Sequence, residues 1–353
     1  MGDKRFYSLD AMRGIAAFAV VISHIDTVMP PSILHYSYLS VDFFFMLSGF
    51  VLARAYVSKL KSSMSVGRFM EVRLIRLYPM FVVGGLLGLM QIAGQIATHS
   101  PRAPGGMDAL IGIATNALIL PDFRSAYMLF PVNVPGWTLF FELVANAIFA
   151  MALFRMRSSL LSFICVATGA LSFWGLIHNG NGDVGWSWPT IGFGVLRVGY
   201  AFPLGILLAR AFGRTTKHYT SFALLPVGGL AVLLAIDLPD RFDWIYDTAA
   251  LFIVLPAILW FGARFALPKP LEKFAAILGD VSYPMFAIHF PLLRIAFYVL
   301  ARRLQLPGVF TAMIFVASCF WLSWLLFHYF DVPVRRWLSA RSKLRPAAMP
   351  VTP

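Results

Sequence analysis

The sequence predicts an all-α polytopic membrane protein with about ten transmembrane helices and with both termini in the cytoplasm. Of the 353 residues, 59% are hydrophobic, and the mean hydropathy is +0.76. Charged residues make up only 13%, against about 25% in an average soluble domain. The basic residues fall in short clusters between long apolar runs. A soluble chain could not bury this much apolar surface and still cover itself with polar groups, so the composition excludes an ordinary soluble enzyme, a disordered protein and a coiled coil.

The predicted helices follow from the lengths of the apolar runs. A helix that crosses a bilayer needs about 20 mostly apolar residues. Ten runs of roughly that length occur, bounded by proline, glycine or polar and charged residues: 11–29, 38–57, 77–97, 134–154, 158–178, 191–212, 218–236, 244–262, 281–301 and 307–330. The segment 108–120 is apolar but shorter, and we expect it to be re-entrant, interfacial or oblique rather than a full span.

The basic residues predict the orientation. With a cytoplasmic N-terminus, the inner segments carry 20 lysines and arginines, and the outer loops carry 5, namely Arg102, Arg124, Arg241, Arg302 and Arg303. This bias is typical of ten spans with both ends inside, whereas an eleventh span at 108–120 would put the basic tail outside. The net charge of +13 therefore fits a membrane topology, and we expect no nucleic acid partner.

One membrane domain over 5–337 is expected, followed by a short basic cytoplasmic tail, 338–353. No cleavable signal peptide is expected, because His24 and Asp26 interrupt the first apolar run and no cleavage site follows it. Both cysteines lie in apolar runs, so we expect no disulfide framework. The sequence has no zinc-ligand cluster, phosphate-binding loop or serine nucleophile elbow, and no bound metal or cofactor is predicted.

Ionisable residues inside the first run are candidates for function, because a charge in the bilayer core costs at least about 2.5–3.5 kcal/mol. Arg13 and His24 are eleven residues apart. That is close to three helical turns, so both point to one side, about 16 Å apart along the axis. Asp10 lies one turn before Arg13 on the same side. The alternative is that Asp10 and Arg13 form an ion pair at the helix end while His24 reaches the outer interface.

The second run contains Ser48 and Gly49, which would let a substrate chain or another helix approach closely; alone, a packing notch is the simpler interpretation. Asp42, near the outer end of this run, could be solvated.

Ahead of the third run, Arg73 and Arg76 are three residues apart and so share a helix face. Together with Arg68 they could bind phosphate groups. The alternative is that they only set the orientation of the chain in the membrane and contact lipid headgroups.

Two further groups lie in later runs. Glu142 lies about two turns into the fourth run, at nearly the predicted depth of His24, where a carboxylate would orient an imidazole and raise its basicity. A structural pairing of Glu142 with an arginine is the alternative. His289 lies inside the ninth run, where a hydrogen bond to a neighbouring helix is the more common role.

Taken together, these motifs resemble the membrane acyltransferase 3 family over about 5–337. The matching segments are 8–14 followed by His24, 41–50 with its Ser-Gly pair, 73–79 with its two arginines, 137–142 with Trp137 and Glu142, and 282–291 with Tyr283 and His289. The chain departs from the family at Thr138, where serine is usual, and at Asp331, where glutamate is usual; both changes are conservative.

The resemblance implies an integral membrane O-acyltransferase without a fused esterase-like domain. It would move an acyl group, often acetyl, from cytoplasmic acyl-CoA, a co-substrate, to a hydroxyl of a cell-surface or lipid-linked glycan in a bacterial inner membrane. Arg73 and Arg76, with Arg68, would hold the CoA head, and Arg13 would line the way to His24. His24 would be a general base or an acyl relay, and Glu142 would orient it.

Asp10, Ser48, Gly49, Trp137, Tyr283 and His289 are assigned supporting roles. The implied partners are membrane lipid, the glycan acceptor and, if an esterase-like module is needed, a separate extracytoplasmic protein. The oligomeric state and the acceptor stay open. The alternative function is a proton-coupled transporter or flippase of a sugar-lipid or small solute, since intramembrane His and Glu could also form a proton relay.

Overall fold

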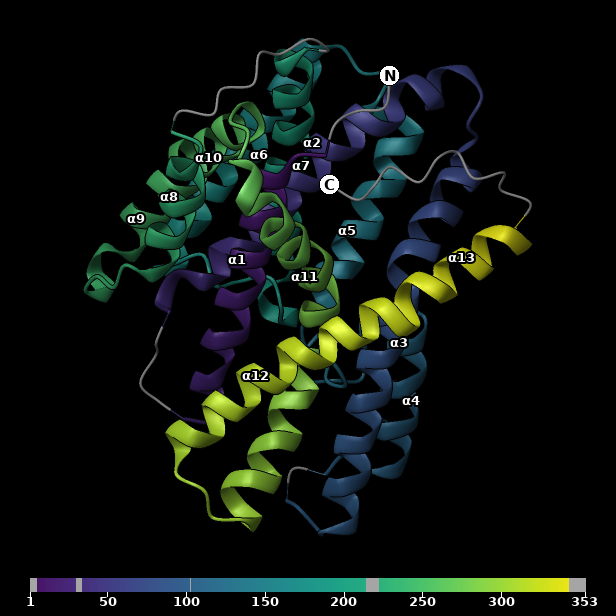
Figure 1. Ribbon diagram of the computed structural model, residues 1–353, viewed down its shortest axis with the longest axis vertical. Helices are drawn as coiled ribbons and strands as arrows, with labels where there is room; N and C mark the ends of the chain where they lie inside the picture. The colour runs from purple at the N-terminus through teal and green to yellow at the C-terminus, as the bar shows by residue number, and fades with distance from the viewer. Residues whose placement is uncertain (1–4, 30–33, 102, 214–221, 343–353) are drawn as a thin grey trace.

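The computed structural model describes residues 5–29, 34–101, 103–213 and 222–342, and within these ranges the chain is helical, with no strand. Figure 1 shows the helices as a single bundle. The α-helices are α1 (Tyr7–Ser23), α2 (Leu39–Ser62), α3 (Val66–Ala97), α4 (Gly106–Ala117), α5 (Gly136–Ile148), α6 (Ser158–Asn179), α7 (Ile191–Phe212), α8 (Leu224–Ala235), α9 (Asp243–Ala249), α10 (Leu255–Arg264), α11 (Lys269–Ala296), α12 (Gly308–Leu326) and α13 (Val332–Arg341).

Short π-helical turns extend or join several of these helices. One extends α5 (Phe149–Leu153), one joins α9 to α10 (Ala250–Val254), one extends α11 (Phe297–Arg303), and one joins α12 to α13 (Phe327–Asp331). The turn at Phe327–Asp331 joins α12 and α13 into one long oblique helix, yellow in Figure 1.

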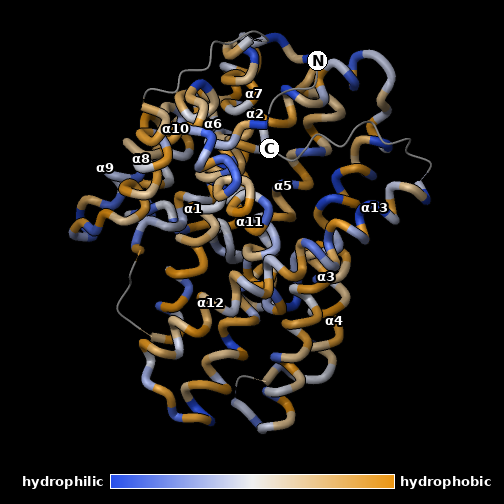
Figure 2. Tube along the Cα trace, in the orientation of Figure 1, coloured by the Kyte–Doolittle hydropathy of each residue, from blue (hydrophilic) through white to orange (hydrophobic). Residues whose placement is uncertain are grey.

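The predicted membrane class is confirmed. Within the described ranges, nine helical segments are long and apolar enough to cross a membrane: Tyr7–Thr27, His35–Ser62, Val66–Ala97, Gly136–Leu153, Ser158–Asn179, Trp188–Phe212, Asp240–Arg264, Lys269–Arg303 and Gly308–Arg341. Figure 2 shows hydrophobic residues along most of these helices. They coincide with nine of the ten predicted runs.

The remaining predicted run, 218–236, coincides with the shorter apolar helix α8, and its first residues, 218–221, lie outside the described residues. As a tenth span it stays a prediction, as does the orientation of the termini. The segment 108–120 forms α4, which has 12 residues. At 1.5 Å per residue, α4 is too short for a hydrocarbon core of about 30 Å, as expected.

Two close helix pairs position the polar residues. Along α1 and α11, Arg13 lies beside Gly279 and Ser282, while His24 lies beside His289. The two helices therefore run side by side in the same direction. Gly279 permits this approach, because a Cβ atom there would lie 2.6 Å from the Asp10 carboxylate.

The second pair is α2 with α7. A Cβ atom at Gly49 would lie 2.1 Å from the Phe202 carbonyl oxygen, and one at Gly205 would lie 2.0 Å from the Met46 carbonyl oxygen. Two backbones therefore meet at reciprocal glycines, the small-residue contact that helices in membranes favour. Gly49 serves helix packing, and it does not line the cavity described below.

We expect Gly49→Ala to destabilise the protein by about 1–3 kcal/mol, the usual cost of overpacking, because the new methyl group would meet a backbone carbonyl. The midpoint of thermal unfolding of the purified protein in detergent measures this. Gly192→Ala in α7 is the matched control, since a Cβ atom there meets nothing within 4 Å. Equal behaviour of the two variants would contradict the packing role.

Candidate active site

A cavity of about 190 Å³ lies between α1, α2, α3, α5 and α11. Its polar lining consists of Arg13, Ser48, Arg73, Arg76, Thr138, Glu142, Ser282 and Tyr283. Its apolar lining is Val41, Phe44, Phe45, Leu47, Val51, Leu52, Leu77, Leu139 and Phe286. Residues from five of the predicted motifs therefore meet at one cavity.

The charges that line the cavity are unequal. Among the described residues, three guanidinium groups line it against one carboxylate, that of Glu142. Glu142 accepts a hydrogen bond of 2.7 Å from Arg73 Nη2 and one of 3.1 Å from Ser48 Oγ. Behind the lining, Asp331 lies 3.6 Å from Arg76 Nη1 and 2.9 Å from Arg335 Nη2. The cavity surface itself keeps an excess of positive charge.

Arg13 is held by α11. Its Nε donates to Ser282 Oγ at 2.8 Å, and its Nη2 donates to the Gly279 carbonyl. Asp10 is fully buried, 3.9 Å from the Arg13 guanidinium, and accepts a hydrogen bond from Arg5. Asp10 thus belongs to an ion-pair cluster with Arg5 and Arg13, and it does not line the cavity.

Arg5 links this cluster to α11. Its Nη2 lies 2.9 Å from Asp280 Oδ1. Burial lowers the pKa of Arg5, but the charges of Asp10 and Asp280 outweigh burial and raise that pKa above its ordinary value.

Other predicted site residues occupy different positions. Tyr283 lines the cavity, donates to the Leu77 carbonyl and lies with its ring 5.9 Å from the Arg76 guanidinium carbon. Arg68 is exposed and does not line the cavity; its backbone N–H donates to Ser65 Oγ, the cap of α3. Arg68 therefore stands apart from Arg73 and Arg76, with which it was grouped.

Trp137 does not line the cavity either. It is buried and packs over Arg197, whose guanidinium carbon lies 5.6 Å from the indole ring. Arg197 binds Asp42 through two hydrogen bonds, of 3.0 and 2.7 Å. Asp42 is thus buried in an ion pair between α2 and α7 rather than solvated, a pairing that the sequence interpretation missed.

His24 lies beyond the apolar end of the cavity and is not part of its lining. Its Nδ1 is 2.7 Å from the Val20 carbonyl oxygen. Its ring meets the ring of His289 edge-on, with centroids 4.9 Å apart, and that of Phe290 at 5.3 Å. His24, which directly follows α1, therefore faces α11, as Arg13 does.

Aromatic ring contacts lead from the cavity lining to His289. Phe44 and Phe286 both line the cavity and contact each other edge-on, with centroids 5.8 Å apart. The Phe286 ring also lies 5.7 Å from that of His289. The cavity lining therefore includes Arg13 and Phe286 but not His24, so the cavity does not reach His24 in this conformation.

The expected pairing of Glu142 with His24 is not observed. The Glu142 carboxylate is bound to Arg73 and Ser48, whereas His24 contacts the Val20 carbonyl and the rings of His289 and Phe290. Glu142 is drawn to the nearest guanidinium, which is the structural alternative that the sequence left open.

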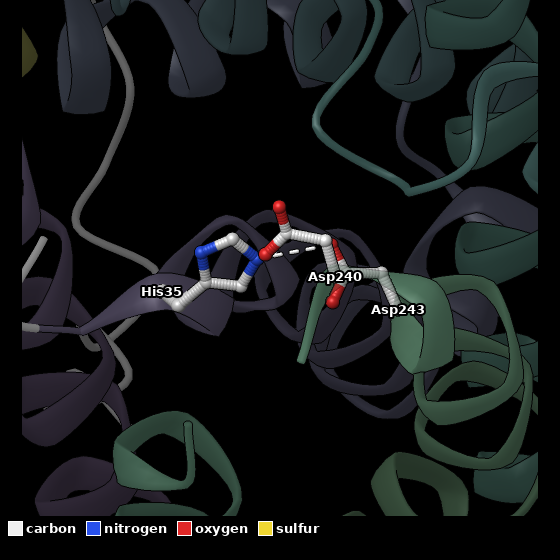
Figure 3. Close-up of side chains that lie close together, drawn as sticks. All are labelled: His35, Asp240 and Asp243. Carbon is white, nitrogen blue, oxygen red and sulfur yellow. Dashed lines mark hydrogen bonds and ion pairs between the residues drawn. The ribbon is translucent and has the colours of Figure 1, made fainter. Parts of the chain in front are cut away.

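A separate cluster of possible metal ligands lies in the turns just before α2 and α9 and at the first residue of α9. Figure 3 shows His35, Asp240 and Asp243 pointing toward one another, with one ligand atom of each lying within 4.8 Å of the others. His35 Nε2 lies 3.1 Å from one Asp243 oxygen, and Tyr36 donates to the other at 2.8 Å. Both oxygens of Asp243 have protein partners, so hydrogen bonds within the protein account for the placement of His35 beside Asp243.

The chain is similar to known proteins. The family described as an acyltransferase domain matches residues 6–328. The chain is 38% identical over 164 residues to "Protein 2 in picA locus" of Rhizobium radiobacter, an alignment that covers 42% of this chain and 82% of that protein. No solved structure matches the chain.

Proposed function

The chain belongs to the membrane acyltransferase 3 family and is an acyltransferase with transmembrane helices. We propose that it moves an acyl group, acetyl in the simplest case, from cytoplasmic acyl-CoA to a hydroxyl of a cell-surface or lipid-linked glycan. The observation that carries this proposal is the excess positive charge of the cavity, where Arg13, Arg73 and Arg76 face one carboxylate.

Acyl-CoA has a head with several phosphate groups and a thioester at the end of a long arm. Guanidinium groups bind phosphate oxygens through paired, charge-assisted hydrogen bonds. Arg73 and Arg76 lie on one face of α3 and line the cavity, so they would bind phosphate while the arm extends along the apolar wall. Binding would weaken the pairs that these arginines now make with Glu142 and Asp331.

His24 would then act as the general base. A carbonyl oxygen only accepts hydrogen bonds, so the contact with Val20 places the ring proton on Nδ1 and leaves Nε2 as the base. Nε2 takes the hydroxyl proton, the hydroxyl oxygen attacks the thioester carbon, and the C–S bond breaks. The proton then passes to the departing thiolate. Rotation of Phe44 or Phe286 would admit the thioester to the ring.

The identity of the acyl donor is tested by adding radiolabelled acetyl-CoA to membranes that contain the protein. Two quantities are measured: the label incorporated into base-labile esters and the free CoA released. Arg76→Gln should raise KM for acetyl-CoA about 10- to 100-fold, because a hydrogen bond to a charged group is worth about 1.5–3 kcal/mol. The maximal rate should change far less.

Arg68→Gln is the matched control on the same helix, since Arg68 is exposed and outside the cavity lining. Its KM should stay at the wild-type value. Equal KM values for both variants would contradict phosphate binding by Arg76. Sugar or proton transport without release of CoA would instead support the transporter alternative.

A further inference from the structure

The two histidine rings that meet between α1 and α11 have the same tautomer. His24 Nδ1 lies 2.7 Å from the Val20 carbonyl oxygen, and His289 Nδ1 lies 2.8 Å from the Phe286 carbonyl oxygen. Each Nδ1 must carry the proton, since each partner is an acceptor. Both neutral rings therefore have an unprotonated Nε2.

His289 Nε2 is fully buried and has no hydrogen-bond partner among the described residues. A buried acceptor without a partner costs about 1–3 kcal/mol and calls for an explanation. The surrounding rings, those of Phe286 and Phe290, offer no donor. The neutral His24 ring also offers none at its Nε2. His24 becomes a donor there only when it takes up a proton.

We propose that His289 is the positioning residue of His24 in acyl transfer: its Nε2 accepts a hydrogen bond from His24 Nε2–H once that ring has taken the hydroxyl proton. This inference rests on the proposed function. It assigns to His289 the orienting role expected for Glu142, whose carboxylate is bound to Arg73 and Ser48.

The proton balance needs no further reactant. The proton leaves the acceptor hydroxyl for His24 Nε2 as the new C–O bond forms and the C–S bond breaks. Once the hydroxyl oxygen has bonded to the thioester carbon and no longer faces Nε2, His289 accepts a hydrogen bond from that N–H, which lowers the cost of the imidazolium charge in an apolar setting. His24 then gives the proton to the CoA thiolate, and both rings return to their neutral forms.

The test compares His289→Leu, which removes the acceptor, with His289→Gln, whose amide oxygen extends about as far along the side chain as Nε2. With saturating acetyl-CoA, the maximal rate of label transfer per folded protein should fall about 10- to 100-fold in His289→Leu, since a hydrogen bond to a charged group is lost. His289→Gln should restore most of the rate. KM for acetyl-CoA should be unchanged in both, because His289 does not line the cavity.

His328→Leu is the matched control. His328 also lies in a candidate membrane span and bonds the carbonyl four residues earlier through Nδ1, at 2.9 Å, but it is exposed. It should keep the full rate. Folding is checked by elution of the detergent-purified variants as single species, and rates are expressed per folded protein.

Two results would overturn the inference: a wild-type rate in folded His289→Leu, or equal losses in His289→Leu and His289→Gln, which would mean a packing role. Failure of the proposed function is distinguishable. In that case membranes with the wild-type protein would transfer no label and release no CoA, whereas failure of this inference alone leaves the wild type and His289→Leu active and His24→Ala inactive.

Discussion

Replacement of His24 by alanine is expected to lower the maximal rate of acyl transfer by about 10²- to 10⁴-fold, the contribution of a positioned general base. The substitution removes Nε2, the nitrogen left unprotonated by the bond of Nδ1 to Val20. KM for acetyl-CoA should stay close to the wild-type value, because His24 lies outside the lining of the cationic cavity. Label transfer from acetyl-CoA in membranes measures both quantities.

A labelling experiment on the wild-type protein separates two chemical routes. If His24 carries the acyl group, purified protein given acetyl-CoA without acceptor should accumulate one acetyl group on His24, found by mass spectrometry of the intact chain. Direct transfer leaves the chain unlabelled. His328→Ala, a histidine in another candidate span, is the control, and equal rates for the two alanine variants would remove His24 from the mechanism.

The shared side of Arg13 and His24 could be predicted because it depends only on helical geometry. Eleven residues make nearly three turns, and both side chains do face α11, at Ser282 and at His289. The seven residues from Ser282 to His289 make nearly two turns, so the same reasoning puts these two on one face of α11. What could not be predicted from the sequence is that α1 and α11 lie side by side and run in the same direction.

The partner of Glu142 could not be predicted in that way. Span counting gives the depth of a residue in the bilayer, and at that level Glu142 and His24 are neighbours. It does not give the direction in which a helix face points, which depends on packing between segments far apart in the sequence. Glu142 of α5 faces Arg73 of α3, and a guanidinium attracts a carboxylate more strongly than a neutral imidazole does.

The pairing of Asp42 with Arg197 could not be predicted for the same reason, because it depends on packing between distant segments. Arg197 lies inside a predicted span, and the cost of its charge there signals that an acidic partner is required. Several acidic residues lie near predicted helix ends, and the sequence does not choose among them. The choice follows from the contact of α2 with α7 at Gly49 and Gly205.

Arg197→Met is expected to destabilise the protein by about 3–5 kcal/mol, the usual result of breaking a buried pair by removing one partner. The side chains of Arg197 and Asp42 are only 6% and 4% exposed, so the carboxylate left behind could not be solvated. Arg197 also donates to the backbone carbonyls of Val184 and Tyr38, both at 2.8 Å, and these acceptors would lose their donor. The midpoint of thermal unfolding in detergent measures the loss.

The double variant Asp42→Leu, Arg197→Met tests whether the loss comes from the unpaired charge. Replacing a whole buried pair by apolar residues is often nearly neutral, so it should recover much of the stability lost in Arg197→Met. No recovery would mean that the backbone hydrogen bonds of Arg197 dominate.

Glu142→Gln provides the contrast with a pair at the cavity surface. The pair of Arg73 and Glu142 is 14% and 24% exposed and lines the cavity, where water can solvate the arginine that remains. Glu142→Gln should therefore destabilise the protein much less than Arg197→Met does. Because Arg73 then no longer pairs with a carboxylate, it should bind phosphate more readily, and KM for acetyl-CoA should fall. Two ion pairs with the same chemistry would then differ in role because one is sealed between α2 and α7, while the other faces the space that the co-substrate would fill.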